Sequence, residues 1–281
     1  MPRAGLVQLN ASDDPEANLP GTERLVREAA GAGAELVLTP EVTNCVSSSR
    51  TRQQAVLRTE AEDATLARLG AVAAETGVWL LIGSLGLKPG PEEAAGDGWL
   101  VNRSFLIAPD GAVAARYDKI HMFDVDIDAE ESHRESAAYR PGGRAVLGAT
   151  PWGPVGLTVC YDLRFPALYR ALAKGGAWLL TVPAAFTVPT GRAHWEPLLR
   201  ARAIETGCFV LAPAQWGRHD VSEGRPRETW GHSLAIDPWG KVLADAGEGT
   251  GVTLVDLDPG AVDAARRRVP SLHNDRPFEG P

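Results

Sequence analysis

The chain has 281 residues, 44% of them hydrophobic, and its 28 Lys and Arg against 36 Asp and Glu give a formal net charge of −8. This length supplies a full core for one large domain, and without a Lys- or Arg-rich run we expect no nucleic-acid partner. The cysteines, Cys45, Cys160 and Cys208, have neither the density of a disulfide framework nor the spacing of a zinc site, and no apolar run reaches the roughly 18 residues of a membrane span. We therefore expect a cytoplasmic protein without a metal, a cofactor or a membrane partner.

Apolar periodicity predicts strands alternating with helices in the first part of the chain. A polar, serine-rich loop is expected over 44–54 and a solvated connection, rich in Pro, Gly and acidic residues, over 88–98. The regular elements expected there are strands over 4–9, 35–40 and 79–85 and helices over 21–31 and 61–75.

The second part of the chain begins with a predicted hairpin that leads to Lys119 and an acidic, irregular stretch over 121–143. An extended tail is expected over 269–281. The regular elements expected in this part are the hairpin strands 102–107 and 112–117, strands 155–159, 178–182 and 209–212, helices 165–172 and 194–206, a second hairpin of 233–236 and 241–244, a final core strand 253–256 and a helix 263–268. This order predicts one α/β domain over 1–281 with a mixed sheet.

Cys160 follows the apolar run 155–159 and precedes the helix expected over 165–172. Such a strand-to-helix elbow exposes a side chain at the carboxyl end of a strand and directs backbone N–H groups, with the helix dipole, at a developing negative charge. An isolated cysteine after Leu-Thr-Val is more often a small buried hydrophobe. The Asp-Leu-Arg segment that comes soon after it favours a nucleophile.

Two other predicted strands end in ionisable residues, Glu41 and Lys119. Side chains at the carboxyl ends of strands converge at one crevice of an α/β sheet, although they are far apart in sequence. Taken alone, Glu41 or Lys119 would be interpreted as a solvated loop residue. Together with Cys160 they supply a general base, an ammonium for an oxyanion and a nucleophile.

Three motifs resemble the nitrilase superfamily of carbon–nitrogen hydrolases, over nearly the whole chain: Pro40-Glu41, Tyr117-Asp118-Lys119-Ile120-His121 and Val159-Cys160-Tyr161-Asp162-Leu163-Arg164-Phe165-Pro166. Within it the chain is most similar to the Nit branch, through His194-Trp195-Glu196, the segments 199–206 and 230–233, and Asp237-Pro238-Trp239-Gly240. The resemblance implies a four-layer α-β-β-α sandwich with two mixed sheets. The chain departs from the family at 42–54, where an aromatic residue often follows Pro-Glu.

The resemblance also implies a catalytic triad of Glu41, Lys119 and Cys160, with a second glutamate at Glu135. In the expected reaction Glu41 takes the Cys160 proton, the thiolate attacks a side-chain carboxamide, and Lys119 with the Tyr161 backbone N–H holds the oxyanion. Ammonia leaves, and water then hydrolyses the thioester. Glu135 would position Lys119 or the substrate, and no cofactor is needed.

Arg164 is the predicted substrate-binding side chain, because in related carbamoylases the arginine of a Cys-x-Asp-x-Arg pattern binds the substrate carboxylate. It could instead pair with Asp162 or cap local carbonyls. The expected substrate is a small α-keto or carboxylate-bearing amide, and the motifs over 200–206 and 215–219 imply deaminated glutathione. The alternatives are ω-amide hydrolysis of α-ketoglutaramate or α-ketosuccinamate, and hydrolysis of N-carbamoyl amino acids.

Two other classes remain open from the sequence. A Cys–His peptidase or acyltransferase would use His121, His194 or His232 as its base, although no histidine stands in a pattern tied to Cys160. A non-catalytic scaffold would not need the three reactive residues. His194-Trp195-Glu196 is interpreted as a structural helix start, and the acidic loop over 124–135 fits no EF-hand spacing.

The resemblance further implies an assembly that pairs helix layers of two chains. The segments expected at its interface are the helix after Cys160 and the helix around Leu199, with the tail 269–281 crossing between chains. We expect a homodimer or a higher homo-oligomer.

Overall fold

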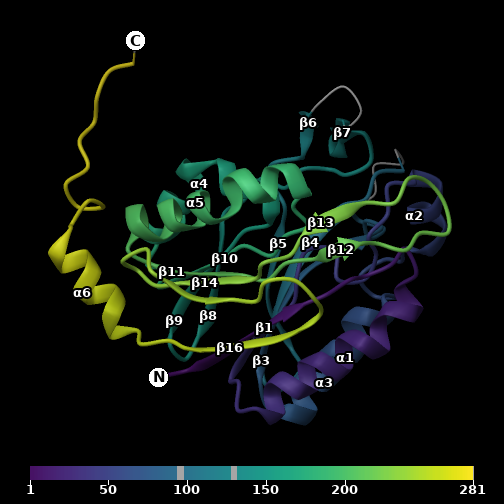
Figure 1. The fold of residues 1–281 in the computed structure, drawn as a ribbon, viewed down its shortest axis with the longest axis horizontal. Helices are drawn as coiled ribbons and strands as arrows, with labels where there is room; N and C mark the ends of the chain where they lie inside the picture. Colours follow the sequence, from purple (N-terminus) through teal and green to yellow (C-terminus); the bar gives the residue numbers. More distant parts are fainter. Residues whose placement is uncertain (94–97, 128–131, 281) are drawn as a thin grey trace.

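The computed structural model describes residues 1–93, 98–127 and 132–280, and two six-stranded sheets lie at its centre (Figure 1). The first sheet runs in the order β16 (Gly251–Asp256), β1 (Arg3–Gln8), β2 (Leu36–Leu38), β3 (Trp79–Leu87), β4 (Val101–Ile107) and β5 (Val113–Asp118). The second runs β15 (Val242–Asp245), β14 (Leu234–Ile236), β11 (Phe209–Ala212), β10 (Leu179–Thr181), β9 (Gly153–Leu157) and β8 (Val146–Thr150). Each has three parallel central strands and antiparallel neighbours, so the predicted α/β class with two mixed sheets is confirmed.

Helices cover the outer face of each sheet (Figure 1). The pair α1 (Pro15–Gly31) and α3 (Ala64–Thr76) packs on the first sheet, and α4 (Pro166–Lys174) and α5 (Val188–Thr206) pack on the second. The short α2 (Arg50–Val56) and the late α6 (Gly260–Arg268) lie outside these pairs. The result is the four-layer sandwich implied by the resemblance.

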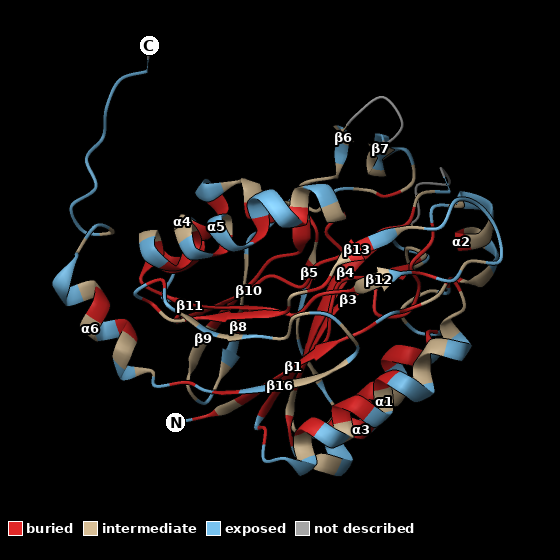
Figure 2. Ribbon diagram, in the orientation of Figure 1, coloured by how far each residue is buried: buried red, intermediate tan, exposed pale blue. Residues whose placement is uncertain are grey.

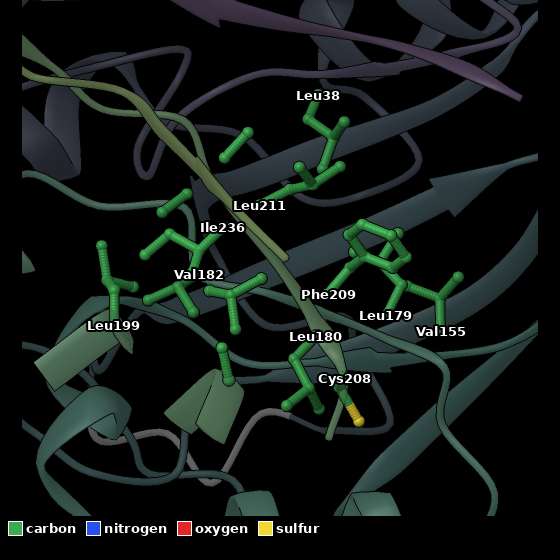
Figure 3. Close-up of a cluster of buried hydrophobic side chains, with 14 of the residues drawn as sticks. Leu38, Val155, Leu179, Leu180, Val182, Leu199, Cys208, Phe209, Leu211 and Ile236 are labelled. Atoms are coloured by element: carbon green, nitrogen blue, oxygen red, sulfur yellow. The ribbon is translucent and has the colours of Figure 1, made fainter. Parts of the chain in front are cut away.

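The central strands of the two sheets are buried on both faces, which Figure 2 shows as red ribbons inside the two helix layers. In β2, Leu36 and Leu38 contact the core between the sheets, while Val37 contacts the core under α1 and α3. This division follows from the two-residue period of a strand. Figure 3 shows Leu38 beside Leu211 and Ile236 of the second sheet.

Several elements differ from their predicted extents. α1 begins at Pro15, where the Asp14 carboxylate accepts hydrogen bonds from two backbone N–H groups, and α5 begins at Val188, six residues before His194. α2 occupies part of the loop expected over 44–54, and β16 is a half-exposed edge strand, not a core strand. The sequence did not predict five strands of three to five residues each: β6 (Asp124–Asp126), β7 (Ser132–Arg134), β8, β12 (Trp216–Arg218) and β13 (Glu228–Trp230).

The strands that lead to the predicted reactive residues end at one side of the sandwich. β2 and β5 run in the same direction within the first sheet, because each of the two antiparallel pairings between β3 and β5 reverses the chain. β9 ends in the second sheet just before a single 3₁₀ turn, η2 (Cys160–Arg164). The described helices include none that is both long and apolar enough to cross a membrane.

Candidate active site

Cys160 lies at the strand-to-helix elbow predicted for it. It is 7% exposed and has a φ of +49°, in the left-handed region that non-glycine residues rarely adopt. Its backbone N–H donates to Pro183 O at 2.9 Å, which ties the elbow to the chain segment after β10. This strained turn places Cys160 at the edge of the buried core, where it lines a cavity.

Buried hydrogen bonds to Asp162 hold the elbow in place. The Asp162 carboxylate accepts from Tyr117 OH at 2.7 Å and from the Val159 N–H at 2.9 Å. It also accepts the backbone N–H of His121 at 3.1 Å and lies 2.7 Å from the His121 Nδ1. The Asp162 carboxylate therefore connects Val159, just after β9, to Tyr117 near the end of β5, two residues before Lys119.

Glu41 follows β2 and is buried against the thiol. Its Oε1 accepts from Lys119 Nζ at 2.8 Å and its Oε2 accepts from the Ala185 N–H at 3.0 Å, and the Cys160 thiol lines the same cavity close enough to lower the pKa of the Glu41 carboxyl. The structure thus brings together the three residues that the sequence placed at three separate strand ends.

Glu135 joins the same cluster from the 3₁₀ turn η1 (Glu135–Ala137). Lys119 Nζ donates to both of its oxygens, at 3.0 and 2.8 Å, and the Phe123 N–H donates to Oε2 at 2.7 Å. Lys119 is only 2% exposed, so its ammonium is held between two carboxylates away from bulk water.

Asn102 is a member of this cluster that the sequence analysis missed. Its side-chain amide donates to Glu41 Oε1 at 3.0 Å and to Glu135 Oε1 at 3.2 Å, and its backbone carbonyl accepts from the Lys119 N–H at 2.9 Å. The available signal was an amide at the first position of the strand predicted over 102–107. By donating to both carboxylates, the Asn102 amide holds Glu41 and Glu135 in place beside the Lys119 ammonium.

The charges of the cluster set its resting protonation. Burial alone would raise the pKa of the Glu41 carboxyl, but the Lys119 ammonium and hydrogen bonds from Cys160 and Lys119 lower it below its usual value. Burial would lower the pKa of Lys119, but Glu135 and Glu41 raise it well above its usual value. Burial and the Glu41 charge raise the pKa of the Cys160 thiol. At neutral pH the site therefore holds a neutral thiol beside an ionised carboxylate and an ammonium.

A cavity of about 230 Å³ opens at this cluster. Glu41, Lys119, Glu135, Cys160 and Tyr161 all line it, together with Cys45, Asn102, Phe123, Arg134, Tyr139 and Arg227 among others. The side chains of the lining are mixed, with aromatic walls and several charged groups. A cavity with these features is suited to a small polar molecule.

Arg164 and Tyr161 have different relations to this cavity. The Tyr161 ring is part of its wall and packs edge-on against Phe123, with ring centroids 5.2 Å apart. The Arg164 guanidinium lies 3.3 Å from the His194 Nδ1 and 5.5 Å from the centre of the Phe186 ring, and it is absent from the cavity lining. It does not pair with Asp162, whose carboxylate is occupied by other donors.

The three histidines considered as bases lie elsewhere. His121 contacts Asp162 and stacks on Phe165, His194 lies on the exposed face of α5 seven residues into the helix, and His232 contacts Asp245 at 3.1 Å. His194 is therefore not the helix-start residue expected from the sequence. None of the three lines the cavity or contacts the Cys160 thiol within the described residues.

The other two cysteines are buried. Cys45, expected in a polar loop, is 2% exposed and lines the cavity, and burial with the nearby Asp13 charge raises its pKa to about 12. Cys208 contacts Ala177 O and Arg266, away from the cavity. Asp124 and Asp126 of the acidic loop contact Ser136 and Arg134, whereas Asp128, Glu130 and Glu131 lie outside the described residues.

Comparisons with known proteins support the same family. A family model described as carbon-nitrogen hydrolase matches residues 3–267. The deaminated glutathione amidase of Yersinia enterocolitica is 39% identical over 275 residues, which cover 96% of this chain and 92% of the relative. The deaminated glutathione amidase of Homo sapiens is 38% identical over 283 residues, which cover 99% of this chain and 83% of the relative.

Solved structures give the same picture. The NitFhit protein of C. elegans matches with a TM-score of 0.88 and 34% identity, over 98% of this chain and 65% of its own. Nit3 of Saccharomyces cerevisiae, described as a member of branch 10 of the nitrilase superfamily, matches with a TM-score of 0.82 and 27% identity. The match covers 96% of this chain and 94% of the Nit3 chain. A mutant amidase from Nesterenkonia sp. AN1 matches with a TM-score of 0.76 and 28% identity, over 97% and 95% of the chains. Its active site cysteine carries the covalently added acetamide moiety of fluoroacetamide.

Proposed function

Because the chain belongs to the carbon–nitrogen hydrolase family, we propose that it is a thiol amidase with Cys160 as nucleophile and Glu41 as general base. The family predicted from the motifs is thereby confirmed. The observation that carries the proposal is the buried Glu41 carboxylate, which contacts both the Cys160 thiol and the Lys119 ammonium.

In the acylation half of the reaction, Glu41 accepts the Cys160 proton as the sulfur attacks the amide carbon. The carbonyl electrons move to the oxygen, which the Lys119 ammonium and the Tyr161 backbone N–H stabilise. Collapse of this intermediate breaks the C–N bond, and the leaving amine takes the proton back from Glu41. A thioester of Cys160 remains.

In the deacylation half, Glu41 takes a proton from water as the hydroxide attacks the thioester carbon. The C–S bond breaks, the acid is released, and the proton on Glu41 returns to the sulfur. Glu135 acts by holding Lys119, since both of its oxygens accept from the same ammonium. No step in this cycle requires an electron acceptor.

The substrate that we propose is deaminated glutathione, which is named in the relatives with 37–39% identity over nearly the whole chain. In this compound the reacting carbonyl is linked to the nitrogen of cysteinylglycine. The leaving group is therefore the dipeptide, whereas a primary carboxamide such as α-ketoglutaramate would release the ammonia expected from the sequence.

A competition experiment tests the substrate. We expect kcat/KM for deaminated glutathione, measured by release of cysteinylglycine, to exceed kcat/KM for α-ketoglutaramate, measured by release of ammonia. A tenfold preference for α-ketoglutaramate, about 1.4 kcal/mol of transition-state binding, would contradict the substrate but not the amidase activity. If neither amide is cleaved while an N-carbamoyl amino acid is, both parts of the proposal fail.

The assembly and the location belong to the same proposal. A homodimer through α4 and α5 is supported by Ile204, an apolar side chain of α5 that is 56% exposed. The chain after α6 extends away from the domain in Figure 1, and its Asp275 pairs with Arg170 and Lys174 of α4. A cytoplasmic location is supported by the three free cysteines.

A further inference from the structure

Arg227 lines the cavity, and its guanidinium forms no ion pair with a carboxylate among the residues that the structure describes. Of the other cationic side chains in the lining, Lys119 pairs with Glu41 and Glu135, and Arg134 pairs with Asp126 at 2.7 Å. The partner of the Arg227 guanidinium is a neutral group, the carbonyl of Ala185, at 3.1 Å from Nη2.

Arg227 is connected to the reacting groups through one residue. The Ala185 N–H donates to Glu41 Oε2 at 3.0 Å, while the carbonyl of the same residue accepts from Arg227. Burial raises the pKa of Glu41, and the positive charge of Arg227 helps to lower it, after the larger lowering effects of Lys119 and Cys160. The guanidinium therefore lies within electrostatic reach of the site of chemistry.

The backbone around Arg227 is held by hydrogen bonds, of which those of the His219 ring are buried and that of Ser48 is exposed. Its carbonyl accepts from the His219 N–H at 2.9 Å, and the His219 ring lies 2.7 Å from both Thr229 Oγ1 and Ala11 O. Two residues earlier, the Arg225 carbonyl accepts from Ser48 Oγ at 2.7 Å. A side chain on such a fixed segment is suited to recognition, because little freedom is lost on binding.

The charge of the site makes this arginine necessary for an anionic substrate. The carboxylates of Glu41 and Glu135 and the ammonium of Lys119 add up to one net negative charge beside Cys160, and this charge would repel a substrate carboxylate. The charge of Arg227 offsets it. One of the five N–H donors of the guanidinium is used by Ala185, so a pair of parallel donors remains for a carboxylate.

We propose that Arg227, not Arg164, binds a carboxylate on the acyl part of the substrate and selects monoamides of dicarboxylic acids over neutral amides. The inference rests on the proposed amidase function and specifies its substrate class. Cys160 and Arg227 line the same cavity, and Ala185 hydrogen bonds both Arg227 and Glu41, so a substrate whose carbonyl carbon reaches the thiol can present a second polar group to the guanidinium. Arg164 lies outside the cavity lining, against His194 and Phe186.

The test compares glutaramate, a five-carbon monoamide with a carboxylate, with the neutral amide pentanamide. Both release ammonia. For Arg227→Gln we expect kcat/KM on glutaramate to fall about ten- to a hundredfold, mainly through KM, because a charge-assisted hydrogen-bond pair is lost. Pentanamide has no carboxylate, so its kcat/KM should fall several-fold less than that of glutaramate, and Arg227→Lys should recover part of the loss on glutaramate.

Arg192→Gln is the matched control, since Arg192 is an exposed arginine that stacks over Trp230 outside the cavity. It removes the same charge and should not change the preference for glutaramate. Equal losses on both amides in Arg227→Gln would overturn the inference. So would a selective loss on glutaramate in Arg164→Gln with none in Arg227→Gln.

A binding measurement separates this inference from the amidase proposal. In the Cys160→Ala background, which cannot turn over, glutaramate should bind by calorimetry, and adding Arg227→Gln should weaken binding at least tenfold. If wild-type protein cleaves no amide, the proposed function fails while this measurement still decides the role of Arg227. Undetectable binding of glutaramate, or unchanged binding in the double variant, would overturn the inference.

Discussion

At the residue scale, the Cys160 thiol and the Glu41 carboxylate divide the roles of nucleophile and base without a histidine. A cysteine beside an imidazolium rests as a thiolate, because the cation lowers its pKa. Here burial and the Glu41 charge raise the pKa of Cys160, so the thiol keeps its proton until a substrate is in place. The Lys119 ammonium keeps Glu41 ionised to accept that proton.

The first prediction concerns the three thiols. We expect Cys160→Ala to abolish amide turnover and to prevent formation of an acyl adduct, measured by intact mass after rapid quenching. Cys208→Ala is the control, because Cys208 packs against Ala177 away from the cavity and should retain turnover with only a modest loss of stability. Residual activity in folded Cys160→Ala would show that the nucleophile is a different group.

The second prediction concerns the two charges beside the thiol. Glu41→Gln removes the base and Lys119→Ala the oxyanion partner, so each should lower kcat by at least about a hundredfold. The double variant should be scarcely worse than the poorer single variant, because the three groups act as a unit. Losses that multiply in the double variant would indicate independent roles.

Lys119→Ala should also lower the free energy of unfolding, by roughly 3–5 kcal/mol, because it leaves Glu41 and Glu135 buried without their cation. Denaturant titration measures this loss, and Lys119→Met distinguishes lost charge from lost volume. Only variants that remain folded at the assay temperature enter the kinetic comparison.

The third prediction is the pH dependence of kcat/KM. Glu41 must be ionised to act, and its pKa is lowered, so activity should persist below about pH 5 and fall only as Glu41 becomes protonated. Lys119 and Cys160 have raised pKa values, so no loss is expected up to about pH 9. An acid limb near about pH 6.5 in protein that remains folded would instead indicate a histidine base.

At the scale of elements, β3 passes between the two segments that hold the reactive residues. Gly83 is the point of closest approach: a Cβ there would lie 2.1 Å from Thr39 O, 2.5 Å from Pro40 O and 2.4 Å from the Pro183 Cβ. Pro40 precedes Glu41, and the Pro183 carbonyl accepts from the Cys160 N–H. The distance between base and nucleophile therefore depends on a glycine in a strand that contributes no reactive group.

The fourth prediction follows from this close approach. Gly83→Ala should push the two segments apart, lowering the free energy of unfolding by about 1–3 kcal/mol and kcat by about tenfold or more. Gly21→Ala is the control, because a Cβ on Gly21 in α1 would meet no atom within 4 Å, and a helical alanine should be neutral or stabilising. A Gly83→Ala protein that loses stability but retains full kcat would contradict this role for β3.

At the scale of the whole molecule, the helix layer over the second sheet has an exposed apolar site. Ile204 of α5 and Trp239 of the β14–β15 turn are 56% and 49% exposed, and Gly240 brings this turn against Ile204. Arg268 of α6 stacks over the Trp239 ring, 3.9 Å from its centre. Exposed side chains of this size on adjacent elements are typical of an interface between chains.

The fifth prediction tests the proposed homodimer. Light scattering should give twice the mass of one chain for the wild type, and Ile204→Glu should shift the protein toward the monomer by burying a charge at the interface. Leu243→Glu, on the half-exposed face of β15, is the control and should leave the assembly unchanged. A monomeric wild type, or an Ile204→Glu protein that stays dimeric, would contradict an interface at this site.

The sequence alone was sufficient for the family, the fold class and the long elements. Runs such as 79–85 and 209–212 have enough apolar residues to predict strands, and Pro40-Glu41 or the segment around Cys160 carries local chemistry that can be recognised without neighbours. Element starts were less predictable. α5 begins at Val188 because Val188-Pro189 opens its first turn, a signal weaker than the apolar face after His194.

Only the tertiary structure decided which side chains share the cavity. Asn102, Cys45 and Arg227 come from a strand, a loop and a hairpin that are far apart in the chain, and no local pattern marks them as neighbours of Cys160. Arg164 was expected to bind substrate from its place in a Cys-x-Asp-x-Arg pattern, and its contact with His194, 3.3 Å from the guanidinium, is one that no local pattern predicts. Periodicity and local motifs report the few residues on either side, whereas burial and electrostatic contact depend on how two separately formed sheets pack together.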